Sequence, residues 1–437
     1  MTQINASTPL APQLRRELGT FGAVMMGLGS IVGTGVFVSI GIAAGIAGPA
    51  VVLAVVLAAL VAVCNGLSSA QLAANHPVSG GTYEYGYKYL NPILGFVAGW
   101  TFLCAKSASA ATAALGFAGY LLSMLHLNNQ LWRMGIALAA VVLLTVIVLA
   151  GIRQSNLMTV LMVSITLGSL LFFIWGGLDN VVKNFATAFN PFFPPPSAGV
   201  KPMRALFHAT ALMFVAYTGY GRIATLGEEV RTPERTIPRA IVITLLTSML
   251  LYVAVALTAV GNVGAANFAT LAVDTSAPLE MIAAGFGIPG AGLLLAIGAV
   301  TAMLGVLLSL ILGLSRVMLA MGRRHDMPIA VARLSKAGNT PEIAVVTVGV
   351  LIAVLVLIGD IRVTWSFSAF AVLLYYAITN LAAYQLPAER RRYPRVVAAL
   401  GLLACLFLAF WVEPAIWITG SLLIITGLSW RWIARKL

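Results

Sequence analysis

Charged side chains are scarce in this sequence. Asp, Glu, Lys and Arg make up 9% of the 437 residues, while hydrophobic residues make up 60%. A soluble domain carries roughly 25% charged residues, and no soluble fold could cover so much apolar surface. The composition therefore excludes a soluble protein and predicts an all-α membrane protein with lipid as its main solvent.

Cysteine, histidine and buried acids are too few for several kinds of chemistry. The three cysteines, Cys64, Cys104 and Cys405, each lie in an apolar run, so there is no disulfide framework and no metal-ligand spacing. The four histidines lie near the ends of apolar runs, and every Asp and Glu falls in a predicted loop or at the end of a span. We therefore expect no metal, no cofactor and no enzymatic site at membrane depth. The absence of a G-x-x-x-x-G-K motif argues against ATP as the driving force.

Apolar runs of about 20 residues, enough to cross a bilayer, recur along the chain. Twelve are present, at residues 21–47, 50–74, 93–124, 133–150, 155–177, 203–227, 238–260, 289–321, 342–358, 364–385, 396–412 and 415–432. Twelve spans put both termini on one side of the membrane.

Basic residues orient these spans. If the termini are cytosolic, eighteen Lys and Arg fall in the inner segments and five in the outer ones. Residues 1–20 are then a short cytosolic tail, not a signal peptide. The net charge of +13 reflects this topology and does not indicate nucleic-acid binding. We expect a plasma membrane location, which in a bacterium is the inner membrane.

Two of the spans contain unusual clusters of glycine. The first includes "GLGSIVGTGVF" (27–37), and the sixth reads "ALMFVAYTGYGRIATLGEEV" (211–230). Glycine weakens helices, so both spans are expected to be interrupted. Their separation by five spans predicts an inverted repeat, with residues 21–177 as the first copy, 203–385 as the second, and two extra helices in 396–433. The alternative for the first span is that its glycines only allow close helix packing.

Interrupted helices expose backbone groups, which membrane proteins tolerate only around a protein-lined cavity. The free N–H groups at the start of a half-helix can hold a carboxylate. Free carbonyls can hold an ammonium group. Such a site suits a zwitterion and needs no charged side chain.

Four stretches carry a resemblance to a known family. They are "GSIVGTGVF" (29–37), "HPVSGGTYEYGYKYLNPILGFVAGW" (76–100), "FVAYTGYGRIATLGEEVRTPERTIPRAI" (214–241) and "SRVMLAMGRRHDMP" (315–328). In these the chain resembles the amino acid–polyamine–organocation superfamily, with its LeuT-type fold of five plus five inverted helices and discontinuous helices 1 and 6. The third stretch is most similar to the cationic amino acid transporter branch.

The resemblance implies a role for each matching position. The substrate carboxylate would be held by the amides of Gly33, Thr34 and Gly35. The substrate amino group would be held by Ile31, Val215, Tyr217 and Thr218. Phe214 and Tyr217 are candidates for an aromatic gate, and Ser107, Ser109 and Ala110 are candidates for the side-chain pocket, although small residues in spans are often packing contacts.

Lys106 lies near the middle of the third span, where its charge is costly in lipid. We expect it to face the cavity; the alternative is that it extends to the interface from a tilted helix. Our hypothesis is that Lys106 titrates during transport and couples transport to protons, or that it replaces a bound cation.

The charges also bear on the substrate. With no acid at mid-membrane, neutral amino acids are expected rather than cationic ones, despite the branch resemblance. Acidic substrates stay open because Arg222 could bind a side-chain carboxylate; alternatively, Arg222 pairs with Glu228 or Glu229. The inner-gate candidates, which could equally be solvated surface charges, are Glu228, Glu229, Arg323 and Arg324.

The predicted function is secondary transport of amino acids by alternating access. An exchanger of amino acids and related amines is the alternative within this class. An ion channel would need symmetric subunits or a charged filter, and no such motif is present. The segment "HLNNQ" (126–130) lacks the cysteine through which some members of the superfamily bond to a glycoprotein, so no such partner is expected. A monomer and a homodimer both stay open.

Overall fold

A computed structural model describes residues 19–76, 78, 80–125, 127, 129–151, 156–193, 201–224, 230–275, 277–335 and 340–434. Helices make up nearly all of these residues. In chain order they are α1 (Thr20–Ile31), η1 (Gly35–Ser39), α2 (Ile40–Ala47), η2 (Gly48–Ala50), α3 (Val51–Asn75), α4 (Thr82–Tyr89), α5 (Pro92–Met124), α6 (Gln130–Leu149), α7 (Asn156–Ala188), α8 (Pro202–Tyr217), η4 (Thr218–Tyr220), α9 (Gly221–Ala224), α10 (Pro233–Asp274), α11 (Pro278–Ala284), α12 (Ala291–Arg323), η5 (Ile329–Ala332), α13 (Glu342–Val356), α14 (Ile361–Tyr384), η6 (Ala388–Arg390), α15 (Arg395–Ala409) and α16 (Pro414–Ala434).

Length and apolar composition identify the helices that could cross a membrane. Seven helical runs among the described residues pass this test. Helices α15 and α16 pass it together, although the chain bends by 114° between them. The shorter helices α1 and α13 are also apolar. The described residues of each of the twelve apolar runs fall mostly on one helix or on helices separated by a short break.

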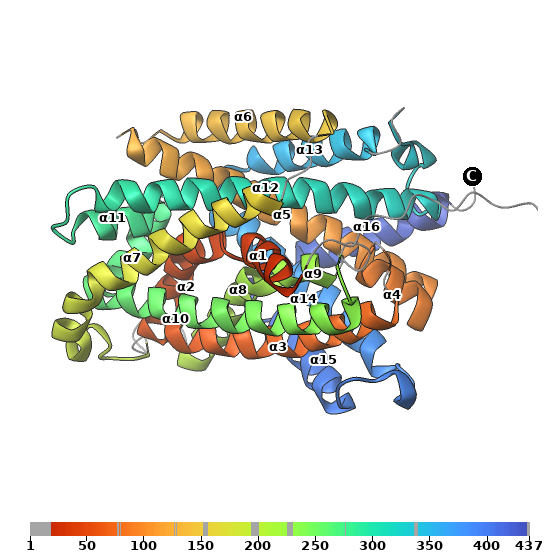
Figure 1. Ribbon diagram of the computed structural model, residues 1–437, viewed down its shortest axis with the longest axis horizontal. Helices are drawn as coiled ribbons and strands as arrows, with labels where there is room; N and C mark the ends of the chain where they lie inside the picture. Colours follow the sequence, from red (N-terminus) through yellow and green to blue (C-terminus); the bar gives the residue numbers. More distant parts are fainter. Residues whose placement is uncertain are drawn as a thin grey trace, which may run out of the picture.

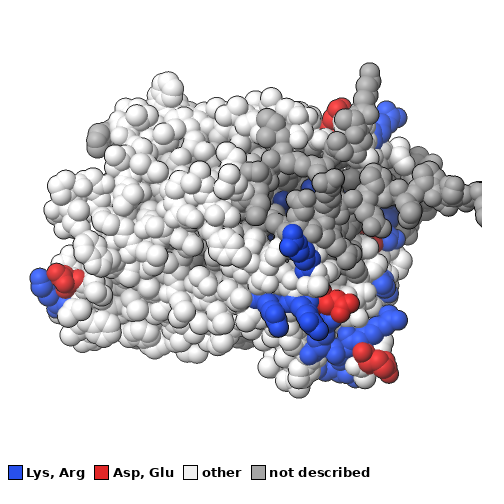
Figure 2. Space-filling model, viewed as in Figure 1, with Lys and Arg blue, Asp and Glu red and all other residues white. Residues whose placement is uncertain are grey.

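The long helices run roughly side by side, with α1 and α8 in the middle of the bundle (Figure 1). Helix α5 packs against α12 and α14, α10 packs against α3 and α7, and α6 packs against α13. In Figure 2, Lys and Arg gather at the end of the molecule where α4 lies, and most of the remaining surface on this face is uncharged. This distribution suits a bundle whose waist is surrounded by lipid.

Both expected interruptions are present. Helix α1 ends at Ile31, and Val32 is extended at φ −79° and ψ 102° before the π-helical turn η1 begins at Gly35. Helix α8 ends at Tyr217 and continues as the 3₁₀ turn η4 and the short helix α9. The first span is thus broken at residues 32–34, and the sixth changes from α-helical to 3₁₀ geometry at Thr218–Tyr220, each within its glycine-containing stretch.

The two interruptions touch each other because one glycine lacks a side chain. A Cβ atom on Gly219 would lie 2.7 Å from the Ile31 nitrogen and closer still to the Ser30 carbonyl. Helix packing accounts for part of the glycine cluster as well, since a Cβ on Gly29 would lie 2.9 Å from Val163 Cγ2. Both interpretations of the cluster therefore apply, each to different glycines.

Candidate functional site

A cavity of about 120 Å³ lies where the two interruptions meet. The α1 break, η4, α5, α12 and α14 all contribute to its wall. Gly80 and Gly81, just before α4, and Arg316, near the end of α12, also line it. The cavity therefore extends from the helix breaks toward the basic end of the molecule seen in Figure 2.

The start of η1 provides backbone donors on the cavity wall. The carbonyl of Gly33 accepts hydrogen bonds from the amides of Val36 and Phe37, at 3.1 and 3.2 Å. These are the first hydrogen bonds of the new helix, so the amides of Thr34 and Gly35 come before the first amide that donates within it. Gly33, Thr34 and Gly35 all line the cavity. The structure therefore brings together the three residues predicted to hold a carboxylate, at a helix start that favours an anion.

Two tyrosines support the carbonyls at the breaks. The Tyr252 hydroxyl of α10 donates to the Ile31 carbonyl at 2.8 Å, and the Tyr376 hydroxyl of α14 donates to the Thr218 carbonyl at 3.2 Å. A carbonyl oxygen has two lone pairs, so each can accept a second donor. Ile31, Val215 and Thr218 line the cavity, as their predicted contact with an amino group requires.

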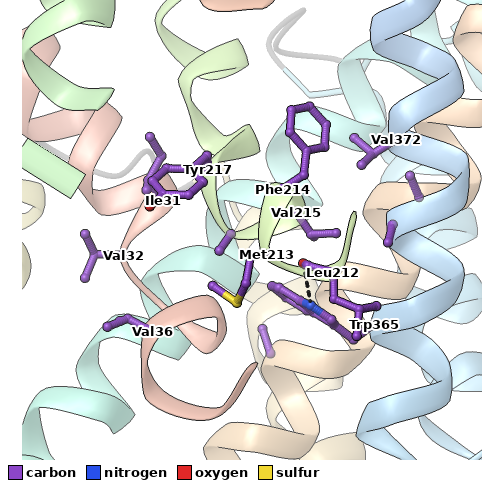
Figure 3. Close-up of a cluster of buried hydrophobic side chains, with 14 of the residues drawn as sticks. Ile31, Val32, Val36, Leu212, Met213, Phe214, Val215, Tyr217, Trp365 and Val372 are labelled. Carbon is purple, nitrogen blue, oxygen red and sulfur yellow. Dashed lines mark hydrogen bonds between the residues drawn. The ribbon is translucent and has the colours of Figure 1, made fainter. Parts of the chain in front are cut away.

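Trp365 of α14 forms another part of the cavity wall. Its indole nitrogen donates to the Leu212 carbonyl of α8 at 3.0 Å, the bond drawn in Figure 3. A Cβ on Gly35 would lie 3.6 Å from the indole Cη2. The side chain is buried and lines the cavity beside Gly35. Trp365 was not among the site residues predicted from the sequence.

Lys106 of α5 lies at the cavity and is 6% exposed. Its Nζ donates to the Thr218 hydroxyl at 2.6 Å, and that hydroxyl donates to the Val215 carbonyl at 2.7 Å. The side chain thus faces the cavity and does not extend to the interface. Its role in coupling stays a prediction.

Of the three candidates for the side-chain pocket, one lines the cavity and two do not. Ser109 lines the cavity, and its hydroxyl is 2.7 Å from that of Ser368. Ser107 and Ala110 are buried but are not among the described residues that line the cavity.

The two gate candidates also lie behind the cavity wall in this structure. Phe214 packs edge-on against the Tyr376 ring, and Tyr217 packs against the Tyr252 ring. Both are fully buried, and neither is among the described lining residues. A gating role for either residue would require it to move, and stays a prediction.

The inner-gate candidates are only partly described. Glu228 and Glu229 lie outside the described residues. Arg324 forms a two-bond ion pair with Glu84 of α4, with Nε 3.0 Å from Oε1 and Nη2 2.6 Å from Oε2. Arg323 is exposed at the end of α12. Glu84 was not predicted from the sequence as the partner of Arg324.

Metal chemistry finds no support in the described part of the chain, where no group of three or more His, Cys, Asp or Glu side chains could hold an ion. The arrangement instead offers backbone donors, backbone acceptors and one buried ammonium around a small cavity. Such a set can bind a small zwitterion.

Comparisons with known proteins agree with this chemistry. The family model described as amino acid permease matches residues 22–433. An uncharacterized transporter of Mycobacterium tuberculosis is 37% identical over 400 residues, which cover 91% of this chain and 86% of the relative. The branched-chain amino acid permease BcaP of Bacillus subtilis is 28% identical, covering 92% of this chain and 89% of its own. The chloroplastic cationic amino acid transporter 7 of Arabidopsis thaliana is 27% identical, covering 85% and 66%.

Proposed function

This chain belongs to the amino acid permease family, and we propose that it moves neutral amino acids across the plasma membrane by alternating access. Its relatives are transporters and permeases rather than enzymes. The observation that carries the proposal is the contact between the two interrupted helices, at a cavity lined by Thr34 and Gly35 at the start of η1 and by Ile31 and Thr218 at the two breaks.

The cavity's charges support a neutral substrate. Among the described residues that line it, none is Asp or Glu, while Lys106, Arg222 and Arg316 contribute positive charge. A cationic side chain would meet repulsion from these lining groups. The relative BcaP is named for branched-chain amino acids, whose side chains are apolar, which agrees with this substrate class.

The architecture we propose has twelve spans. Residues 21–177 and 203–385 form two inverted five-helix repeats, 396–433 add two helices, and both termini face the cytosol. The interrupted helices α1–η1–α2 and α8–η4–α9 then occupy equivalent positions in the two repeats. In this orientation the cavity opens to the cytosol, because the segment before α4 and the end of α12 both line it and α4 lies at the basic end of the bundle (Figures 1 and 2).

Uptake by purified full-length protein in liposomes tests the proposal. We expect saturable uptake of neutral amino acids such as L-leucine and L-alanine, and little uptake of L-arginine or L-lysine. Preloading the liposomes with unlabelled amino acid distinguishes the alternative, since an obligate exchanger would take up label only when preloaded. Strong, saturable arginine or lysine uptake would refute the neutral-substrate proposal.

A further inference from the structure

An arginine cluster lies in the turn between α14 and α15, at the end of the molecule where Lys and Arg gather (Figures 1 and 2). Its members are Arg390, Arg391, Arg392 and Arg395. In the part of the chain that the structure describes, only Arg392 forms an ion pair, with Glu234 of α10 at 3.2 Å. Glu389 is the one acid within the turn itself. The cluster therefore carries more positive charge than these two carboxylates offset.

Two of these arginines lie at the end of α14. The Nε of Arg391 donates to the Leu386 carbonyl at 2.6 Å, which uses one of the five N–H groups of its guanidinium. The Cζ of Arg395, an exposed residue, lies 5.3 Å from the centroid of the Tyr384 ring. Tyrosine at the end of a span is typical of the membrane interface, where lipid headgroups lie. Both guanidinium groups are therefore expected at the level of the headgroups.

An apolar stripe continues from Arg395 along the outside of α15. It consists of Val396, Leu400, Leu403 and Phe407, which are 48–64% exposed. Their spacing places them on one face of the helix, while another face packs against α3 and α14. From the first to the last of the four, an α-helix rises about 16 Å. This length is close to half of the roughly 30 Å hydrocarbon core of a bilayer, so the stripe spans about one leaflet.

We propose that this face binds a phospholipid with a net negative headgroup, such as phosphatidylglycerol, in the leaflet at the basic end of the protein. The lipid phosphate binds the guanidinium groups of Arg391 and Arg395, whose N–H groups match phosphate oxygens in geometry and charge. One acyl chain follows the stripe of α15 through the leaflet. Phosphatidylcholine has the same phosphate, but its choline ammonium is repelled by the arginine cluster.

The proposed lipid lies against a turn that is bonded to another helix of the bundle. Asn75 at the end of α3 donates to the Arg390 carbonyl at 2.8 Å, and the Gln71 side chain of α3 accepts from the Arg392 amide at 3.3 Å. A lipid that binds only the folded turn stabilises the folded protein. None of these residues lines the cavity, so the inference does not depend on which substrate is moved.

Native mass spectrometry on the purified full-length protein in a neutral detergent tests the inference. Dioleoylphosphatidylglycerol and dioleoylphosphatidylcholine are titrated separately, and the lipid-bound fraction gives each Kd. We expect phosphatidylglycerol to bind at least about tenfold more tightly, because each basic residue near the membrane surface adds attraction to an anionic lipid. Inorganic phosphate at the same concentration should displace none of the bound lipid, since it has no chain to contact α15. Displacement by phosphate would show a simple anion site and would overturn the inference.

Two matched pairs of substitutions locate the site. Arg391→Gln with Arg395→Gln removes two charges from it and should weaken phosphatidylglycerol binding at least about tenfold. Arg235→Gln with Arg239→Gln removes two exposed charges near the start of α10 and should change the Kd less than about twofold. Thermal melting verifies that the variants are folded. Arg395→Gln alone, at an exposed residue, should weaken binding at least about threefold and replaces the first pair if that variant does not fold.

Two further outcomes would overturn the inference. One is equal affinity of the wild-type protein for the two lipids. The other is an equal loss of affinity in the Arg391/Arg395 and Arg235/Arg239 variants, because the attraction would then come from the overall charge of this end of the molecule. Neither outcome bears on the proposed amino acid transport, which the uptake measurements test separately.

Discussion

The indole nitrogen of Trp365 donates a hydrogen bond to the Leu212 carbonyl across 3.0 Å, which joins α14 to the first half of an interrupted span. One residue earlier on α14, the Thr364 hydroxyl accepts a hydrogen bond from Thr112 of α5 at 2.8 Å. Ten residues further along α14, about 15 Å away, the Tyr375 hydroxyl accepts a hydrogen bond from the Thr82 amide at the start of α4. Trp365 therefore lies at the end of the cavity away from α4, and we expect it to close that end.

Replacing Trp365 with Phe should loosen this closure. An aromatic ring stays, but the Leu212 carbonyl loses the indole donor, at a cost of about 1 kcal/mol to the closed arrangement. The reporter is Val215→Cys in a background without Cys64, Cys104 and Cys405. With Trp365→Phe added, we expect this cysteine to react at least about fivefold faster with an impermeant maleimide from outside than it does with Trp365 in place. Trp132→Phe, at an exposed position on α6, is the control, and equal rates in the two variants would rule out a closing role for Trp365.

Gly219→Ala tests the contact between the interruptions. Its Cβ would overlap the Ser30 carbonyl, so the two breaks must move apart, and we expect at least a tenfold loss of amino acid affinity. Gly168→Ala on α7 is the matched control, since its Cβ would meet nothing within 4 Å and should leave binding unchanged. Both affinities are measured on purified protein. Undiminished binding by a folded Gly219→Ala variant would contradict the described geometry.

A buried ion pair holds the last helix to the rest of the protein. Asp326 is fully buried; its Oδ1 accepts from Arg431 of α16 at 3.1 Å, and its Oδ2 accepts from the hydroxyls of Tyr83 and Tyr87 of α4. Asp326→Asn leaves the Arg431 charge buried and unpaired, so we expect it to lower the free energy of unfolding by about 3–5 kcal/mol.

An exposed pair provides the comparison. Arg362 and Glu413 are 3.0 Å apart with side chains 51% and 46% exposed, and Glu413→Gln should cost at most about 1 kcal/mol. Denaturant titration in detergent measures both variants. If Asp326→Asn and Glu413→Gln lower the free energy of unfolding by the same amount, Asp326 does not hold α4 and α16 to the rest of the protein.

How far the sequence predicts this site depends on the kind of feature. The interruptions were predictable because clustered glycines weaken a helix wherever they occur in an apolar span. Lys106 was predictable because a charge at mid-span needs a cavity. Both signals are local. By contrast, the hydroxyl that donates to the Ile31 carbonyl belongs to Tyr252. This residue lies 221 positions away, on a helix with no unusual composition.

The same limit accounts for the residues that the sequence did not reveal. Tyr376 and Trp365 are ordinary aromatic residues in an apolar helix, and their hydrogen bonds to η4 and α8 arise only when α14 packs beside the breaks. Asp326 was predicted to lie in a loop; its burial depends on Arg431, 105 positions further along the chain, and on α4 folding back over the end of α12. No pattern within a single segment carries these pairings.

His76 should make the protein less stable at acidic pH. Partial burial at the end of α3 and repulsion by Lys88, whose Nζ is 2.9 Å from the ring Nδ1, lower its pKa in the folded protein. The unfolded chain therefore binds the proton more readily, and stability present above about pH 6.5 declines as the pH falls through that value. His76→Gln and Lys88→Met should each make the decline in melting temperature shallower. A steeper decline in either variant would contradict this sign.

The most direct test of the account is whether the protein recognises both ends of a zwitterion. Calorimetry on purified protein compares L-leucine with L-leucine methyl ester, which lacks the carboxylate, and with N-acetyl-L-leucine, which lacks the ammonium. The breaks at Gly33–Gly35 and Val215–Thr218 predict that leucine binds and that each analogue binds at least about a hundredfold more weakly, because a charge-assisted contact is lost in either case. Binding of the ester or the acetylated form as tightly as leucine would contradict the account.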